Sequence, residues 1–291
     1  MKSRAQGFWA QLLLLFVCVF AYSSSAPSQT ADEVEKRIAN LPAEQRTYER
    51  FRHWVLTTLP PDQQVNAARG DAGLFARYHD YLKTSGFSEA EADAQIETIR
   101  AQGTRGEAER WNRILTAEKP TFNTKPNEFL TEMAKGRKPG TALDVGMGQG
   151  RNAIWLALQG WDVTGFDPAE KAVALANETA NKLGVAIKTE VKSTEDFDFG
   201  ERRWDLILLS YTVGGREIPN VLQKALKPGG VLIIESFLHD VTEGATIGFD
   251  PGELPKFYPL LRVVRYEEPL ANPDFGTGKM RLVRYCAERP K

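Results

Sequence analysis

The chain has few of the residues that build covalent cross-links or metal sites. It contains two cysteines, Cys18 and Cys286, and Cys18 lies in an apolar run near the N-terminus. A single cysteine in the remainder excludes an internal disulfide there and disfavours a cysteine-built metal site. The three histidines, His53, His79 and His239, form no H-x-x-x-H pair. The sequence therefore predicts no metal site.

An excess of charge of one sign is also absent. The formal net charge is −1, so no basic field attracts nucleic acid, and no nucleic-acid partner is predicted. The sequence shows no repeat at solenoid periods and no long low-complexity tract. Hydrophobic residues make up 42% and charged residues 26%, which is the composition of a globular protein with a core of normal size.

The N-terminus carries a conspicuous apolar run. Lys2 and Arg4 precede the apolar residues 8–22, and the small polar stretch SSSAPSQT follows. This order is typical of a secretory signal, and the run of about 15 residues is shorter than the roughly 20 of a membrane span. Residues 1–26 are expected to be a signal peptide or an uncleaved membrane anchor. The protein is then exported or membrane-anchored, and it is cytoplasmic only if the segment is not used.

Residues 27–120 are expected to form a helical N-terminal region that begins with a polar linker to about residue 45. The apolar residues beyond the linker recur at helical spacing, and we interpret the aromatic ones as core. Ser88 and Glu91 form a capping-box pair at a helix start. Helices are expected over residues 44–59, 74–86, 88–102 and 107–117, with breaks at Pro60, Gly103 and Gly106.

From Thr141 the pattern changes to strands that alternate with helices, which predicts a parallel sheet covered on both faces. Strands are expected over 142–146, 162–167, 185–191, 204–211 and 230–237, and helices over 152–159, 169–183 and 218–226. Two further apolar stretches flank the turn-rich NPDFGTG near the C-terminus. They predict a terminal antiparallel hairpin, because no helix separates them. The domain is expected to span residues 121–291.

A glycine-rich turn follows the first strand. Gly146, Gly148 and Gly150 stand directly between strand and helix, where residues without Cβ let a ligand approach the backbone. Open α/β sheets bind ligands at this edge. The dinucleotide fingerprint has its third glycine one residue later, where this chain has Arg151, and no G-K-[ST] follows. The spacing therefore disfavours NAD, FAD and nucleoside triphosphates.

Asp167 ends the second strand, 21 positions after Gly146. A carboxylate at this place can accept hydrogen bonds from two ribose hydroxyls. The alternative is that Asp167 is the N-cap of the next helix, with Pro168 at the first helical position. We favour ribose binding, because the glycine turn already predicts a nucleotide-like cofactor.

Four blocks of sequence together resemble the class I S-adenosylmethionine-dependent methyltransferases. The blocks are LDVGMGQG at 143–150, VTGFD at 163–167, WDLI at 204–207 and LKPGGVL at 226–232. The continuation Gly150-Arg151-Asn152 is similar to the small-molecule enzymes of the tellurite- and thiopurine-methylating kind. The resemblance implies a Rossmann-like α/β fold with a seven-stranded sheet and an antiparallel C-terminal hairpin, preceded by the helical region. It also implies S-adenosylmethionine as the cofactor.

Site residues follow from the resemblance by position. Asp144 and the glycine turn would hold the methionine end of the cofactor, and Asp167 the ribose. The stretch after the third strand would contact adenine, with Ser193, Glu195 and Asp196 as alternatives. The predicted cofactor-binding residues are Asp144, Gly146, Met147, Gly148, Gly150, Asn152, Asp167, Pro168, Glu195 and Ser210.

The expected reaction is an in-line displacement that moves an activated sulfonium methyl group to a small-molecule acceptor. Most of its catalysis comes from positioning the two reactants, so no fixed catalytic residue can be assigned. An oxygen or nitrogen acceptor needs a base, and the candidates are Tyr211 and His239, with Glu235 and Asp240 near them. Residues 240–254 are a candidate substrate loop, and residues 122–127 a candidate lid.

Two other functions compete with this one. A methyltransferase-like binding module without activity gains weight from the export signal, because S-adenosylmethionine is made in the cytoplasm. An NAD(P)-linked oxidoreductase is the weaker alternative. The methyl acceptor, cleavage of residues 1–26 and the oligomeric state stay open from sequence.

Overall fold

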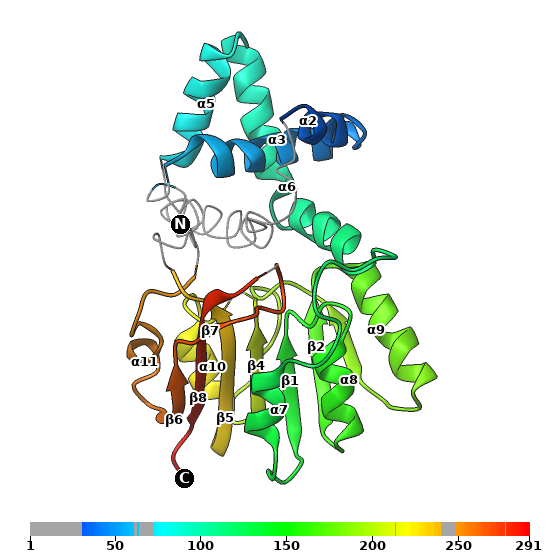
Figure 1. The fold of residues 1–291 in the computed structure, drawn as a ribbon, viewed down its shortest axis with the longest axis vertical. Helices are drawn as coiled ribbons and strands as arrows, with labels where there is room; N and C mark the ends of the chain where they lie inside the picture. Colours follow the sequence, from blue (N-terminus) through cyan, green and yellow to red (C-terminus); the bar gives the residue numbers. More distant parts are fainter. Residues whose placement is uncertain (1–30, 61–62, 64–72, 213, 240–247, 277) are drawn as a thin grey trace. The chain divides into compact units, whose positions relative to one another are not determined.

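The computed structural model describes residues 31–60, 63, 73–212, 214–239, 248–276 and 278–291. The predicted signal segment, residues 1–26, lies outside this range, as do Asp240 and most of the candidate substrate loop. Within the described residues, no helix is both long and apolar enough to cross a membrane. The chain divides into two compact units, Met1–Glu107 and Ala108–Lys291 (Figure 1).

The first unit is helical, as predicted. It holds α2 (Ala31–Ala39), α3 (Ala43–Thr58), α5 (Leu74–Thr84) and most of α6 (Glu89–Leu115). The ring of Tyr78 lies 5.0 Å from that of Phe51 and 4.9 Å from that of Trp54, and all three side chains are buried. The aromatic residues at helical spacing are therefore core, which confirms the sequence interpretation.

Two predictions for this unit are wrong. The expected polar linker contains the helix α2. This helix has an apolar residue to bury, because the Ile38 side chain is only 2% exposed. The expected break at Gly103 and Gly106 does not occur, and α6 runs through both glycines. At Gly106 the missing side chain makes room, since a Cβ there would come within 3.3 Å of the Tyr48 ring. The glycine thus serves close packing rather than a turn.

The second unit contains a mixed sheet with the strand order β3-β2-β1-β4-β5-β8-β6. Pairing is parallel from β3 to β5, and β8 pairs antiparallel with both β5 and β6. The strands are β1 (Thr141–Val145), β2 (Asp162–Asp167), β3 (Lys188–Val191), β4 (Trp204–Ser210), β5 (Leu226–Phe237), β6 (Arg262–Glu267), β7 (Leu270–Ala271) and β8 (Met280–Glu288). The fold class and the terminal hairpin are confirmed. The count of seven strands is wrong, because the short β7 also pairs with β8 and makes the sheet eight-stranded.

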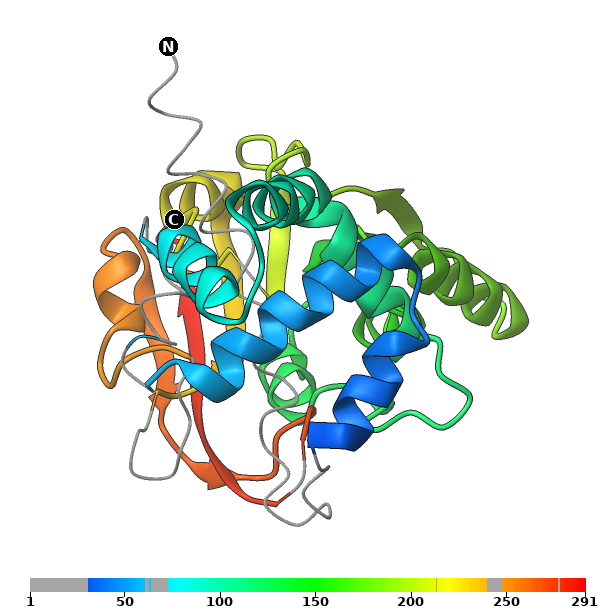
Figure 2. The ribbon, with the colours of Figure 1, turned by 90° about the horizontal axis from the view of Figure 1, so that it is seen from above.

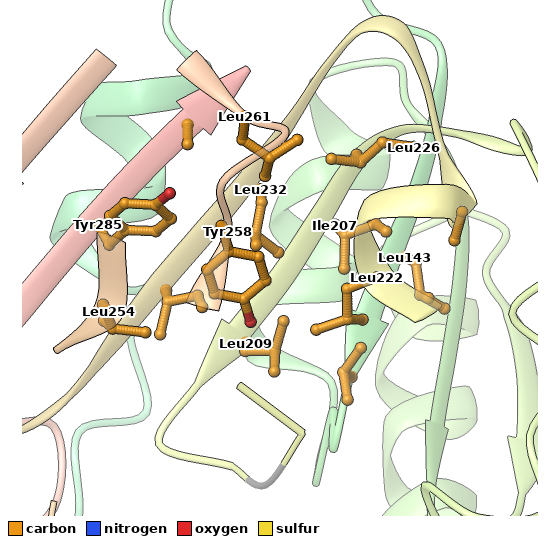
Figure 3. Packing of buried hydrophobic residues seen from close by; sticks show 14 of the residues in the cluster. Leu143, Ile207, Leu209, Leu222, Leu226, Leu232, Leu254, Tyr258, Leu261 and Tyr285 are labelled. Atoms are coloured by element: carbon orange, nitrogen blue, oxygen red, sulfur yellow. The ribbon is translucent and has the colours of Figure 1, made fainter. Parts of the chain in front are cut away.

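Helices cover both faces of this sheet. One face packs on α10 (Pro219–Ala225) and α11 (Leu254–Phe257), and Leu222, Leu254 and Tyr258 join its core (Figure 3). The other face packs on α7 (Glu128–Ala134) and α8 (Arg151–Leu158). The remaining helix of this unit's described residues, α9 (Glu170–Lys182), connects β2 to β3. Figure 2 shows α9 and α11 at opposite ends of the sheet.

Two strand boundaries differ from the sequence expectation for local reasons. β3 begins at Lys188 rather than Val185, because the Val185 N–H closes the end of α9 by donating to the Ala180 carbonyl. β5 begins at Leu226, which already pairs with Trp204 before the register shifts between Trp204 and Leu206.

The C-terminal part of α6 lies at the C-terminal edge of the parallel strands inside the second unit. The side-chain oxygen of Asn112 accepts a hydrogen bond from the Lys171 N–H at 2.8 Å. It thereby caps the first turn of α9, whose own N-cap residue, Ala169, makes no side-chain cap. The Leu115 side chain packs closely on Gly148, since a Cβ at Gly148 would lie 3.2 Å from it. This end of α6 is thus fixed beside the turn that follows β1.

Candidate cofactor and methyl-transfer site

The glycine turn has a backbone that ordinary residues rarely adopt. Gly146, Gly148 and Gly150 have φ values of +64°, +55° and +80°, in the left-handed region that favours glycine. A Cβ on Gly146 would overlap the Thr212 side chain, and one on Gly150 would lie 2.8 Å from the Ala176 Cβ. The turn therefore requires glycine for its conformation and for its close contacts.

Asp167 lies beside this turn at the end of β2. Its carboxylate accepts one hydrogen bond from the Gly148 N–H at 2.9 Å and another from the Ala169 N–H at 2.8 Å. Burial raises the pKa of Asp167 to about 6, against the effect of these two donors. The helix α9 begins only at Glu170, so Asp167 is not its N-cap residue and Pro168 is not its first residue. The carboxylate holds the turn and keeps lone pairs for hydroxyl donors.

Asp144, near the end of β1, is 1% exposed. Its Oδ2 is a buried oxygen without a hydrogen-bond partner among the described residues. Burial raises the pKa of Asp144 to about 7, although Arg151 and the Ala153 N–H favour the ionised form. Leaving such an oxygen unsatisfied costs about 1–3 kcal/mol. It therefore indicates a place for a ligand donor such as the ammonium group of a cofactor.

The other predicted cofactor residues occupy different positions around the turn. Met147 is buried, and its N–H donates to the Phe166 carbonyl at 3.0 Å. Asn152 is buried and accepts the Asn127 N–H at 2.9 Å. Ser210 lies at the end of β4, and Pro168 follows Asp167. Glu195 is exposed, unlike the residues above, which are buried or half-buried.

The alternatives for the adenine contact separate in the structure. Ser193 is buried, and its hydroxyl donates to the Asp196 carboxylate at 2.9 Å. Both Asp196 and Glu195 are exposed. Phe197 packs its ring on Phe166 with 4.0 Å between the centroids. Phe197 therefore holds this turn to the sheet, and the Ser193 hydroxyl supports the turn internally.

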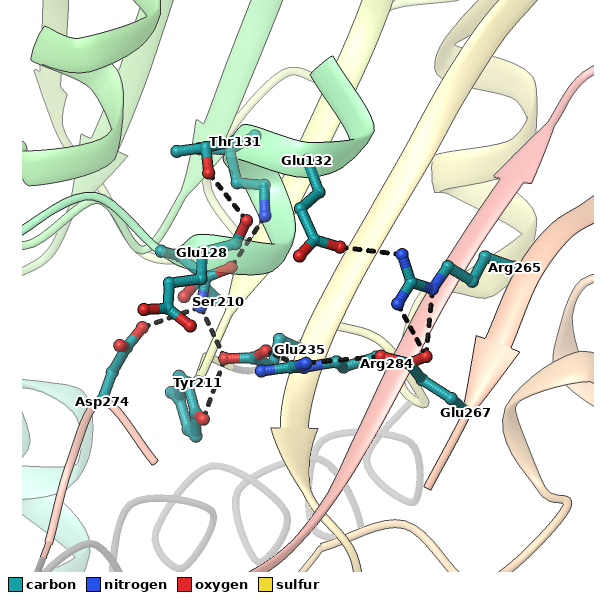
Figure 4. A network of polar contacts seen from close by, with 12 residues as sticks. Glu128, Thr131, Glu132, Ser210, Tyr211, Glu235, Arg265, Glu267, Asp274 and Arg284 are labelled. Carbon is teal, nitrogen blue, oxygen red and sulfur yellow. Dashed lines mark hydrogen bonds and ion pairs between the residues drawn. The ribbon is translucent and has the colours of Figure 1, made fainter. Parts of the chain in front are cut away.

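A polar network joins residues at the ends of β4 and β5 with Arg284 of β8 (Figure 4). Glu235 is 2% exposed and accepts hydrogen bonds from Tyr211 Oη at 3.0 Å, Asn127 Nδ2 at 2.5 Å and Arg284 Nε at 2.6 Å. Burial raises its pKa, while Arg284 lowers it. A carboxylate with three donors is held in place, so Glu235 fits a positioning role better than that of a base.

Tyr211, a catalytic candidate, follows β4 with a φ of +55°. Such a conformation is unusual for an aromatic residue and is concentrated at functional sites. Its ring lies 5.0 Å from Phe237 and 5.7 Å from Phe275. Burial, together with the nearby carboxylate of Glu235, holds the pKa of Tyr211 well above its ordinary value. The phenol therefore stays protonated and acts as a donor.

His239, the other candidate, lies two residues beyond β5. The imidazole Nδ1 of His239 is 2.8 Å from the Asp250 carboxylate, and the backbone N–H of His239 donates to the Phe249 carbonyl. Its Nε2 is buried without a hydrogen-bond partner among the described residues. A neutral imidazole that donates from Nδ1 carries its lone pair on Nε2. This arrangement resembles an oriented base more than the Tyr211 site does.

Several residues that shape this edge were not singled out from the sequence. They are Asn112, Thr212, Asp274 and Arg284. Asn127 was named only within the candidate lid, and Arg151 only within a motif, without a role for either. Their partners lie up to 151 positions away in the chain. The sequence feature that could have pointed to Asp274 is its position beside an aromatic residue, Phe275, inside a turn-rich stretch.

Comparison with known proteins agrees with this geometry. Residues 118–276 match the family model described as tellurite resistance protein TehB. The chain belongs to the TehB family. The match covers more than half of the chain, and the class I S-adenosylmethionine-dependent methyltransferase domain that the resemblance implied is confirmed.

Individual relatives match over shorter stretches. A probable S-adenosyl-L-methionine-dependent methyltransferase TehB of Haemophilus influenzae is 38% identical over 76 residues, which are 24% of this chain and 27% of the relative. A ubiquinone biosynthesis O-methyltransferase of Paramagnetospirillum magneticum is 36% identical over 99 residues, which are 32% of this chain and 39% of the relative. The chain therefore spans well under half the length of these two curated relatives.

A solved structure supports the fold. The protein that converts a disulfide bond into a thioacetal group during echinomycin biosynthesis has a TM-score of 0.52 and 21% identity, with 63% of this chain and 92% of that chain covered. At this identity the likeness supports the α/β fold alone.

Proposed function

We propose that this TehB-family protein transfers the methyl group of S-adenosylmethionine to a small-molecule acceptor. The observation that carries the proposal is the left-handed glycine turn beside the buried carboxylates of Asp144 and Asp167. Turn and carboxylates lie at the C-terminal edge of the parallel strands, where open α/β sheets bind ligands. The sequence spacing and the family match both favour this cofactor over a dinucleotide.

The residues fit the cofactor in two separable ways. The glycine turn gives the close backbone approach that the methionine end needs, with the unsatisfied Oδ2 of Asp144 as a partner for its ammonium group. Asp167 accepts from the ribose hydroxyls. The bound cofactor supplies a sulfonium-activated methyl group. The protein's share of an in-line displacement is to hold the acceptor opposite that group and to exclude water.

The two catalytic candidates take different roles in this proposal. Tyr211, held by Glu235, orients the acceptor through its hydroxyl and its ring face. His239, oriented by Asp250, accepts a proton from an oxygen or nitrogen nucleophile through Nε2. A thiolate or another deprotonated acceptor needs no such base. A loss of activity in His239→Gln limited to protonated acceptors would support this division, and an equal loss with every acceptor would contradict it.

Isothermal titration with S-adenosylhomocysteine tests the cofactor assignment directly. Binding by the folded protein, with NADH giving none, is the expected result. A folded sample that binds NADH instead would reject the proposal. In a separate assay the protein is given S-adenosylmethionine, and formation of S-adenosylhomocysteine is measured with oxyanions, thiols, phenols and amines as acceptors. Binding without such formation across the whole panel would favour the alternative of a binding module without activity.

A further inference from the structure

Two chain segments far apart in the sequence lie side by side at the site. Residues 122–127 precede α7, and residues 272–276 lie between β7 and β8. Phe122 and Phe275 form an antiparallel bridge, and their stacked rings are 5.2 Å apart. The Asn123 N–H donates to the Asp274 carbonyl at 2.7 Å, and Asn123 Nδ2 donates to Asp274 Oδ1 at 2.8 Å. We call these paired segments the strap.

Arg151 fastens the strap to the cofactor turn. It is the first residue of α8, directly after Gly150. Its Nη1 donates to the Lys125 carbonyl at 2.7 Å, and its Nη2 donates to Asp274 Oδ2 at 2.6 Å. The side chains of Arg151 and Asp274 are each only 8% exposed. One guanidinium thus contacts both halves of the strap.

Asp274 also reaches the acceptor side of the site. Its Oδ2 accepts from Asn127 Nδ2 at 2.8 Å, and the same Asn127 group donates to Glu235. Glu235 holds the Tyr211 hydroxyl, and the Tyr211 ring faces Phe275. A single carboxylate therefore connects the residue that follows the glycine turn with the residues around the expected acceptor.

The buried ion pair is better explained by positioning than by stability. Desolvation of two charges offsets most of their attraction, so a buried pair adds little net stability, although loss of one partner is costly. Arg151 also lies near the Asp144 carboxylate, whose ionised form it favours. A cofactor ammonium at Asp144 would compete for that carboxylate and leave Asp274 as the main partner of Arg151. Cofactor binding would then tighten the contact between Arg151 and the strap.

We propose that Asp274 is a positioning residue that couples cofactor binding to closure of the strap over the acceptor side. This inference rests on the proposed function, because it needs a cofactor at the glycine turn. It assigns to residues 122–127 and 272–276 the part of an acceptor-site wall that becomes rigid when the cofactor is bound.

Amide hydrogen exchange on the full chain, with and without S-adenosylhomocysteine, tests the coupling. In the wild-type protein the ligand should slow exchange in peptides that cover the strap by about tenfold, as expected when a local opening becomes about 1.4 kcal/mol less favourable. Asp274→Asn keeps the size of the side chain but removes the charge and the acceptor at Oδ2. It should bind the ligand no more than about tenfold more weakly than wild type, the most that loss of a tenfold coupling can remove, and it should lose most of the ligand-induced protection of the strap.

Two further variants complete the test. Arg151→Lys keeps the charge but cannot serve two acceptors with a planar fork, so it should lose protection over 122–127 even if Asp274→Asn does not fold. Asp205→Asn, which removes the ion pair with Lys227 at the start of β4, is the matched control and should behave as wild type. If the wild type binds the ligand but strap exchange is unchanged, or if Asp274→Asn keeps full protection, the coupling is rejected and the cofactor assignment stands. If the wild type does not bind, both proposals fail.

Discussion

At the scale of single residues, the candidate site contains two carboxyl groups, Asp144 and Asp167, whose pKa values burial raises to about 7 and about 6. Asp167 also joins two segments, because its two backbone donors come from the glycine turn and from the start of α9. Its identity was predicted from its place at the end of a strand. The double backbone contact was not, because it depends on how β1 and β2 align.

Asp167→Asn should weaken binding of S-adenosylhomocysteine by about 10-fold or more, since hydrogen bonds to a charged group contribute about 1.5–3 kcal/mol. Titration calorimetry measures the loss. The 2′-deoxyribose analogue of the ligand distinguishes a ribose contact from general damage to the turn. Wild type should discriminate against this analogue, whereas the variant should not. Asp162→Asn, which removes an exposed ion pair with Lys188 at the start of the same strand, is the control. Equal discrimination by the Asp167 variant and wild type would reject the ribose assignment.

At the scale of elements, the turn between β1 and α8 is defined by backbone conformation and by packing together. The spacing of glycines after a buried strand predicted the turn and the helix to within a residue. It did not predict which glycine lacks room for a side chain. That depends on Ala176 of α9, which packs against Gly150.

Gly150 and Gly184 form a matched pair for testing this. Both have positive φ, at +80° and +70°, but a Cβ on Gly184 has no atom within 4 Å. Gly184→Ala should cost about 1–2 kcal/mol of unfolding free energy, the conformational term alone. Gly150→Ala should cost more, because the new Cβ would lie 2.8 Å from that of Ala176. Urea unfolding of both variants measures the difference, and equal losses would show that α8 and α9 adjust freely.

At the scale of the whole molecule, the second unit places Asp144, Asp167 and Glu235, which are buried, toward one edge of its sheet. Strand alternation was enough to predict a parallel sheet with helices on both faces and a terminal hairpin. Residues 122–127 were predicted as a candidate lid, but their pairing with residues 272–276 and the network around Glu235 were not predictable. Several of the hydrogen bonds concerned join residues more than 100 positions apart, such as Asn127 with Glu235 and with Asp274.

The raised pKa values of Asp144 and Asp167, about 7 and about 6, predict how stability depends on pH. Between their unfolded values near 4 and these folded values, the native state binds more protons than the unfolded state. The free energy of unfolding of the ligand-free protein should therefore fall as pH rises from 5 to 8. The decrease is at most roughly 4 kcal/mol, at 1.36 kcal/mol per pKa unit.

Denaturant unfolding across this pH range measures the decrease. The variant with both Asp144→Asn and Asp167→Asn should show a flatter profile. Saturating S-adenosylhomocysteine should also flatten it, because the ligand favours the ionised carboxylates. A profile that rises from pH 5 to 8 in the wild-type protein would contradict the assignment of these two groups.

Local sequence patterns were sufficient for the α/β class, the glycine turn and the family resemblance, and they led to the prediction that Asp144 and Asp167 are cofactor carboxylates. These features depend on short-range patterns, in which strand, turn and helix are contiguous and each residue type has a local physical reason. Three features required the folded structure: Gly106 lies within a continuous helix, the sheet has an eighth strand, and Asp274 and Arg151 meet beside the glycine turn. Those outcomes depend on burial and on hydrogen bonds between distant segments, which no local pattern specifies.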